Sequence, residues 1–205
     1  MSLRRIAAWT VAWAVVLAPT VFLQMQNLHA QISDGENVVV SLNIANSAVP
    51  INVIAIPEKR IPSTGNNSTH LTIEVRQPGE TSYVFSGTVI TTANGTYSGV
   101  QLTNVSDGAT YDITAKGFSH LRRKESNVTI TSGSTIDFTA NGTNPLLSGD
   151  VNGASGDNKV NGIDLTLIVG GLNGSNERLD LNQDTKVNGI DLTNAVDNLN
   201  KTGDI

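Results

Sequence analysis

Apolar and polar residues alternate at a period of two from about residue 37 to residue 140, in a stretch rich in Thr, Val, Ile and Asn. This pattern predicts β-strands that bury one face. Gly-containing turns separate the expected strands, which cover 37–45, 70–77, 82–90, 110–117, 127–131 and 135–140. We therefore expect a mostly β domain over residues 37–140, a sandwich of about seven antiparallel strands.

A helical period replaces the alternation near the carboxyl end. Apolar residues recur there at i, i+3, i+4 and i+7 in two segments, which hold Leu165, Ile168, Val169 and Leu172, and then Leu192, Ala195, Val196 and Leu199. The spacing predicts two short helices whose apolar stripes pair. A domain of this size, residues 146–203, buries little apolar surface and needs another source of stability.

A third pattern occupies residues 1–30. Arg4 and Arg5 precede an apolar run from Ile6 to Leu23, and Ala30 is a small residue suited to cleavage. The segment is either a cleaved signal peptide or an uncleaved membrane anchor. In both cases the rest of the protein is secreted or on the cell surface, and it meets a membrane only through this segment if it stays uncleaved.

Eight residues, KVNGIDLT, occur at 159–166 and again at 186–193. The second copy completes DLNQDTKVNGID, residues 180–191, which we call the second loop. Its oxygen-bearing side chains have the spacing of a twelve-residue calcium loop. The predicted ligands are Asp180, Asn182, Asp184, the carbonyl of Lys186, Asn188 and Asp191.

The first loop, residues 150–164, is three residues longer. Alignment on the shared KVNGID gives the ligands Asp150, Asn152, Asp157, the carbonyl of Lys159, Asn161 and Asp164, provided that 153–156 bulge outward. Asn158 and Thr185 stand where Gly normally makes the sharp turn, and Asp replaces the usual closing Glu. We therefore expect two Ca²⁺ ions, bound at micromolar affinity or weaker, and folding of this domain that depends on them.

Charge and composition favour a cation as the ligand. The net charge of -5 lies in residues 148–205, where nine acidic residues face four basic ones. This excess argues against a nucleic-acid partner. Cysteine is absent, so disulfides and thiolate metal sites are excluded. His70 and His120 have no partner at ligand spacing and are expected at the surface or a strand edge, and LRRKE at 121–125 is expected to be a solvated loop.

Residues 148–202 resemble a type I-like dockerin, the calcium-binding module that plugs extracellular proteins into cohesin domains. The duplicated loop, the V-N-x-x-D-L motif after each loop and the short helix carry this resemblance. It implies a cohesin-like extracellular partner, contacted by Gly162, Ile163, Gly189 and Ile190. Two equal faces would permit two binding orientations. Val169-Gly170 and Val196-Asp197 replace the Lys-Arg pair of dockerins in well-studied cellulose-degrading assemblies.

The stretch from Gly87 to Ile130 resembles prealbumin-like, carboxypeptidase-regulatory or Cna-B-like sandwich modules, which imply a spacer or adhesive unit. No acid pair, triad or cofactor loop has recognisable spacing, so we expect a protein that is not an enzyme. An alternative is a calcium-stabilised structural module that packs on its own sandwich and has no separate partner. An enzyme with an appended docking module is a third class.

Overall fold

The structure is a computed structural model that describes residues 47–139 and 145–205. The leader expected at 1–30 and the strand expected at 37–45 lie outside these residues. Within the described part, the helices are too short or too polar to cross a membrane.

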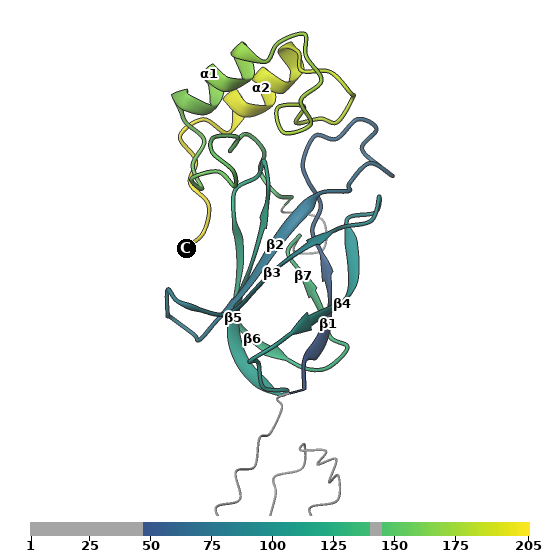
Figure 1. Ribbon diagram of the computed structural model, residues 1–205, viewed down its shortest axis with the longest axis vertical. Helices are drawn as coiled ribbons and strands as arrows, with labels where there is room; N and C mark the ends of the chain where they lie inside the picture. Colours follow the sequence, from purple (N-terminus) through teal and green to yellow (C-terminus); the bar gives the residue numbers. More distant parts are fainter. Residues whose placement is uncertain (1–46, 140–144) are drawn as a thin grey trace, which may run out of the picture. The chain divides into compact units, whose positions relative to one another are not determined.

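Seven strands in the described residues form two sheets (Figure 1). One sheet has the order β4-β1-β7, from strands Thr96–Leu102, Val49–Ile54 and Thr135–Asp137. The other has the order β3-β2-β5-β6, from strands Tyr83–Ile90, His70–Arg76, Ala109–Gly117 and Arg123–Ile130. The mostly β architecture expected from the alternation is confirmed.

The inner faces of the two sheets share one hydrophobic core. In β1, Val49, Ile51 and Val53 are buried, and the residues between them are half-buried. Leu71 and Ile73 of β2 occupy the same core from the opposite sheet. Successive side chains of a strand point to opposite faces, so the period of two in the sequence becomes an inner and an outer face.

Strand β7 departs from the expected antiparallel arrangement. Residues 52–54 of β1 pair in parallel with residues 135–137 of β7, whereas β1 and β4 are antiparallel. The expectation of a wholly antiparallel sandwich is therefore wrong at this pair. The cause is topological. After β6 the chain leaves the four-stranded sheet, and β7 joins the three-stranded sheet at the free side of β1.

Three expectations at the carboxyl end of β5 and the start of β6 are corrected. Residues 121–125 are not a solvated loop, because Leu121 is buried and Arg122 forms an ion pair with Glu74 at 3.3 Å. β6 already begins at Arg123. His120 is only 1% exposed, and its burial lowers its pKa well below the usual range. His70, by contrast, is exposed as expected.

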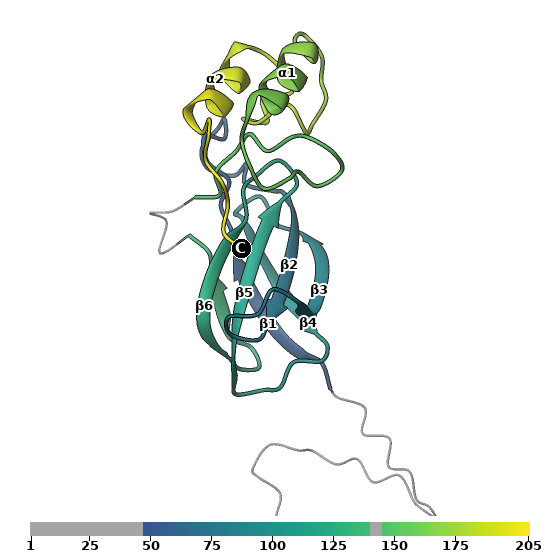
Figure 2. The same cartoon turned by 90° about the vertical axis from the view of Figure 1, so that its left-hand side faces the viewer.

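The two expected helices are α1, Gly162–Gly170, and α2, Gly189–Asp197, which lie side by side (Figure 2). They enclose a second, small core around Ile168 and Ala195. The predicted stripes are only half right. Val169 and Val196 are exposed, and Leu172 and Leu199 lie beyond the helix ends and are exposed as well.

Candidate metal centre

Hydrogen bonds from the backbone to carboxylates shape the second loop. Asp180 accepts from the N–H groups of Asp184 at 3.1 Å and Thr185 at 2.8 Å. Asp191 accepts from those of Leu181 and Asn188, both at 2.8 Å. The first and last predicted ligands are thus held facing the interior of one turn of chain.

The first loop repeats this network despite its greater length. Asp150 accepts from the N–H groups of Asp157 at 3.0 Å and Asn158 at 2.9 Å, and Asp164 accepts from that of Val151 at 2.9 Å. Gly153 and Gly156 adopt positive φ, at 57° and 75°. The three extra residues are therefore absorbed by an outward bulge, as the alignment of the two copies predicted.

Asn158 and Thr185 occupy equivalent sharp turns, with φ of 66° and 79°. Asn adopts this left-handed region readily, whereas a β-branched residue does so at a cost. The turn thus keeps its shape without Gly in both loops, but with backbone strain at Thr185 in the second.

Asn161 and Asn188 have a role that the ligand spacing did not predict. The side-chain oxygen of Asn161 accepts from the N–H of Ile163 at 2.8 Å, and that of Asn188 from the N–H of Ile190 at 2.7 Å. Each Asn is the N-cap of its helix and forms a capping box with the closing Asp. The N-x-x-D spacing is the sequence signal for such a cap.

Two carboxylates and one amide of the second loop are buried, and the carboxylates have no direct ion-pair partner in the described residues. Asp180 is 4% exposed, and Asn182 and Asp191 are fully buried. Burial raises the pKa of Asp180, and the charges of Asp191 and Asp184 raise it further. Among the described residues, no ion pair reaches Asp180, Asp184 or Asp191, although the buried guanidinium of Arg60 attracts Asp180 without forming one. Such a site gains stability from a cation.

The donor set of the second loop suits calcium, which prefers carboxylate, amide and carbonyl oxygens. In the described part of the chain, no three carboxylate, imidazole or thiol groups gather closely enough to hold a metal by themselves. An ion would therefore also need Asn182 and the carbonyl of Lys186. Asn188 would act through water, as the ninth position often does, because its oxygen caps α2.

The ammonium group of a lysine in the sandwich contacts the first loop. The Nζ of Lys116, from β5, lies 2.6 Å from Oδ2 of Asp150 and donates to the carbonyl of His120 at 2.8 Å. Burial raises the pKa of Asp150, and the ion pair with Lys116 opposes this shift. Sequence reasoning missed the pair because its members lie 34 residues apart, one in a strand and the other in a loop.

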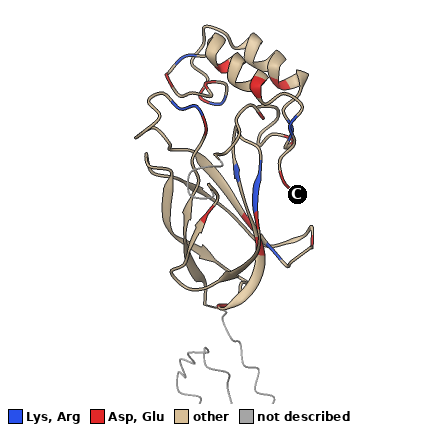
Figure 3. Ribbon diagram, turned by 180° about the vertical axis from the view of Figure 1, so that it is seen from behind, with Lys and Arg blue, Asp and Glu red and all other residues tan. Residues whose placement is uncertain are grey.

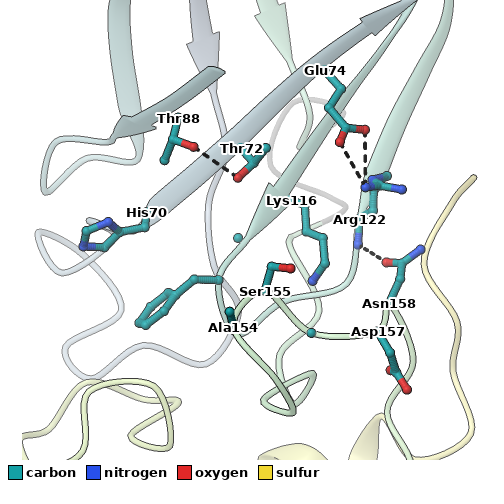
Figure 4. A pocket seen from close by; sticks show the side chains of 13 residues that line it. His70, Thr72, Glu74, Thr88, Lys116, Arg122, Ala154, Ser155, Asp157 and Asn158 are labelled. Carbon is teal, nitrogen blue, oxygen red and sulfur yellow. Dashed lines mark hydrogen bonds and ion pairs between the residues drawn. The ribbon is translucent and has the colours of Figure 1, made fainter. Parts of the chain in front are cut away.

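The bulge of the first loop also borders a hollow of about 580 Å³ against the four-stranded sheet (Figure 4). Ala154 and Ser155 line one side of it, and Thr72 of β2 lines another. The backbone N–H of Arg122 donates to the side chain of Asn158 at 2.7 Å at its edge. The tail, which we define as residues 146–203, therefore contacts the sandwich through polar groups.

The residues expected to face a partner are exposed at the start of each helix. Ile163 is 60% exposed and Ile190 48% exposed. Gly162 and Gly189 have open space where a side chain would begin. Neither helix contains a basic residue, as the blue and red colouring in Figure 3 shows. The structure thus brings two equivalent apolar positions to the surface.

No protein-family model matches the chain, and no curated protein is significantly similar to it. Among solved structures, the chain is similar to one in a type II cohesin–X–dockerin complex from Acetivibrio cellulolyticus mutated at its C-terminal interface. The TM-score is 0.54 at 21% identity, over 76% of this chain and 97% of that one. The complex mutated at its N-terminal interface gives a TM-score of 0.48 at 21% identity, over 76% and 96% of the two chains.

The extent of the first match is informative about the fold. Residues 1–144 make up less than the 76% of the chain that is matched, so the likeness must extend into residues 145–205. The matched fold therefore includes part of the helical tail as well as the sandwich.

Proposed function

We propose that this chain is an extracellular, non-catalytic protein whose tail, residues 146–203, is a calcium-dependent dockerin-type module that binds a cohesin-type partner. The sandwich, expected at residues 37–140, is a spacer or adhesive unit. The observation that carries the proposal is the duplicated loop and helix, each with a buried Asp at both ends of its loop and an exposed Ile at its helix start.

The exposed isoleucines suit an apolar interface. Large apolar side chains at the centre of an interface commonly supply most of its binding energy. Ile163 and Ile190 stand at the same position of α1 and α2, and Leu167 extends the exposed apolar surface along α1. A cohesin that offers a complementary apolar surface would bury these side chains.

Calcium links this surface to folding. The helix starts are held by the same segments that carry the predicted ligands, through the capping boxes of Asn161 and Asn188. Neutralisation of the second-loop carboxylates by an ion would stabilise these segments and hold the isoleucines in place. Binding of a partner should then be lost when calcium is removed.

A direct test uses the full chain and a panel of purified type I and type II cohesins, with affinity measured by calorimetry in calcium and in chelator. The double substitution Ile163→Asp with Ile190→Asp should abolish a calcium-dependent interaction. Ile90→Asp is the matched control, because Ile90 is 55% exposed on β3 and outside the tail. Binding that survives both the double substitution and the chelator would refute the proposal.

One observation favours the alternative, a structural module without a separate partner. The tail makes hydrogen bonds to the sandwich and its loops, including Asn66 to the carbonyl of Gln183 at 3.1 Å and Ser119 to that of Arg178 at 2.8 Å. The alternative predicts that calcium stabilises the chain while no cohesin binds it. The same calorimetry, combined with thermal unfolding, distinguishes the two.

A further inference from the structure

We infer that Lys116 is a built-in cation for the first loop, so that the sandwich closes this loop with its own ammonium group and only the second loop takes calcium tightly. The inference rests on the proposed calcium binding and changes its stoichiometry. It also makes the sandwich a part of the docking module.

The contact is short, buried and completed by a second bond. Nζ of Lys116 lies 2.6 Å from Oδ2 of Asp150, and the two side chains are 8% and 0% exposed. The same Nζ donates to the carbonyl of His120 at 2.8 Å. Water screens such a pair poorly, so its attraction is much stronger than that of a surface ion pair.

Asp180, the equivalent of Asp150, has no such partner. Both residues accept the same two backbone hydrogen bonds from their own loops. In the described residues, however, no ion pair reaches Asp180: the buried guanidinium of Arg60 attracts its carboxylate without forming an ion pair, and Asp191 and Asp184 repel it. Asp180 therefore lacks the direct ion pair that Lys116 makes with Asp150.

The first loop is also shaped to bring its carboxylate to the lysine. A Cβ added at Gly156 would lie 2.2 Å from both carboxylate oxygens of Asp150. The register of the two networks places Gln183, which has a Cβ, at the equivalent position of the second loop. The carboxylate of Asp150 thus occupies the space beside Gly156 where a side chain would begin.

Calcium in the first loop would have to share Asp150 with the ammonium group. Two cations on one carboxylate repel each other, and the repulsion is large where water is excluded. Lys116 cannot withdraw without leaving a buried charge unpaired. We therefore expect calcium to bind the first loop at least about tenfold more weakly than the second.

Calcium titration of the full chain by calorimetry tests this inference. The expected result is one tight site and a second site at least about tenfold weaker. Lys116→Met should tighten the weak site, in the first loop, by about tenfold or more and leave the tight site, in the second loop, unchanged. Lys124→Met, a control on the adjacent strand β6, should change neither site. Two equally tight sites in the unchanged chain would overturn the inference.

A second variant shows which loop holds the tight calcium site. It also keeps the inference testable if Lys116→Met does not fold. Asp191→Asn should abolish the tight site and leave only the weak one; a remaining tight site would place calcium in the first loop and refute the inference. The absence of any calcium binding to the unchanged chain would instead refute the proposed function. The two failures are therefore distinguishable.

Discussion

The carboxylate of Asp191 accepts a hydrogen bond from the backbone N–H of Leu181 at 2.8 Å and so ties α2 to the beginning of the second loop. Asp191 is fully buried and also accepts from the N–H groups of Asn182 and Asn188. One side chain thus satisfies three backbone donors. The fold of the loop depends on this residue even before any ion is considered.

Asp191→Asn should therefore destabilise the chain in the presence of chelator. An amide keeps one acceptor oxygen but turns an NH₂ group toward a backbone donor, at a cost of about 1–3 kcal/mol. Urea unfolding followed by circular dichroism measures this cost. Asp197→Asn is the control, because Asp197 is largely exposed and its ion pair with Lys59 contributes less than about 1 kcal/mol. Equal losses in the two variants would contradict the prediction.

Two isoleucines of α1 should differ sharply when shortened. Ile168 is fully buried in the small core, whereas Ile163 is 60% exposed. Ile168→Ala should cost about 2–5 kcal/mol of unfolding free energy, and Ile163→Ala less than about 0.5 kcal/mol. If Ile163→Ala proves as destabilising as Ile168→Ala, its side chain is not free for a partner.

His120 should make the stability of the chain depend on pH. Burial lowers its pKa, and the charges of Arg60 and Lys116 lower it further. The imidazole of His120 then binds a proton in the unfolded chain but not in the folded chain. The free energy of unfolding therefore falls as pH decreases below about 6.5. His120→Leu should flatten the decline in unfolding free energy between pH 7.5 and 5.5, whereas His70→Leu, at an exposed histidine, should leave it unchanged. An identical decline in His120→Leu would contradict the assignment.

Thr185→Asn should stabilise the chain by about 0.5–1 kcal/mol, because Asn tolerates positive φ better than a β-branched residue does. The reverse change in the first loop, Asn158→Thr, should destabilise it by more. Asn158 also accepts from the N–H of Arg122 and donates to the carbonyl of Asp204 at 2.9 Å. Thermal unfolding of both variants in chelator gives the comparison, and opposite signs are expected.

The hydrophobic periodicity of the sequence predicted those strands and helices whose own residues alternate between a buried and an exposed face. The alternation in β2 and the helical spacing around Ile168 each report which face is buried, so these elements were expected correctly. β5 was also located, but it is buried on both faces, which its alternation did not predict. β1 and β4 were not located. Pro50 stands inside β1, and Gly99, with φ of 78°, forms a bulge opposite β1, so both strands look interrupted in the sequence.

The candidate site shows a similar division. The repeat itself located both loops and the bulge in the first of them. The partner of Asp150 could not be found in this way, because Lys116 lies 34 residues earlier and belongs to a strand with its own pattern. Nor does the ligand spacing reveal that Asn161 and Asn188 also cap helices, since the same residue type suits both roles.

The parallel pairing of β1 with β7 has a consequence for the order of assembly. β1 is the earliest described strand, yet its neighbours β4 and β7 begin only at Thr96 and Thr135. Contacts between residues so distant in sequence form slowly. As the chain is synthesised, β1 must remain unpaired until most of the sandwich has emerged, and its apolar face must be kept from aggregating during that interval.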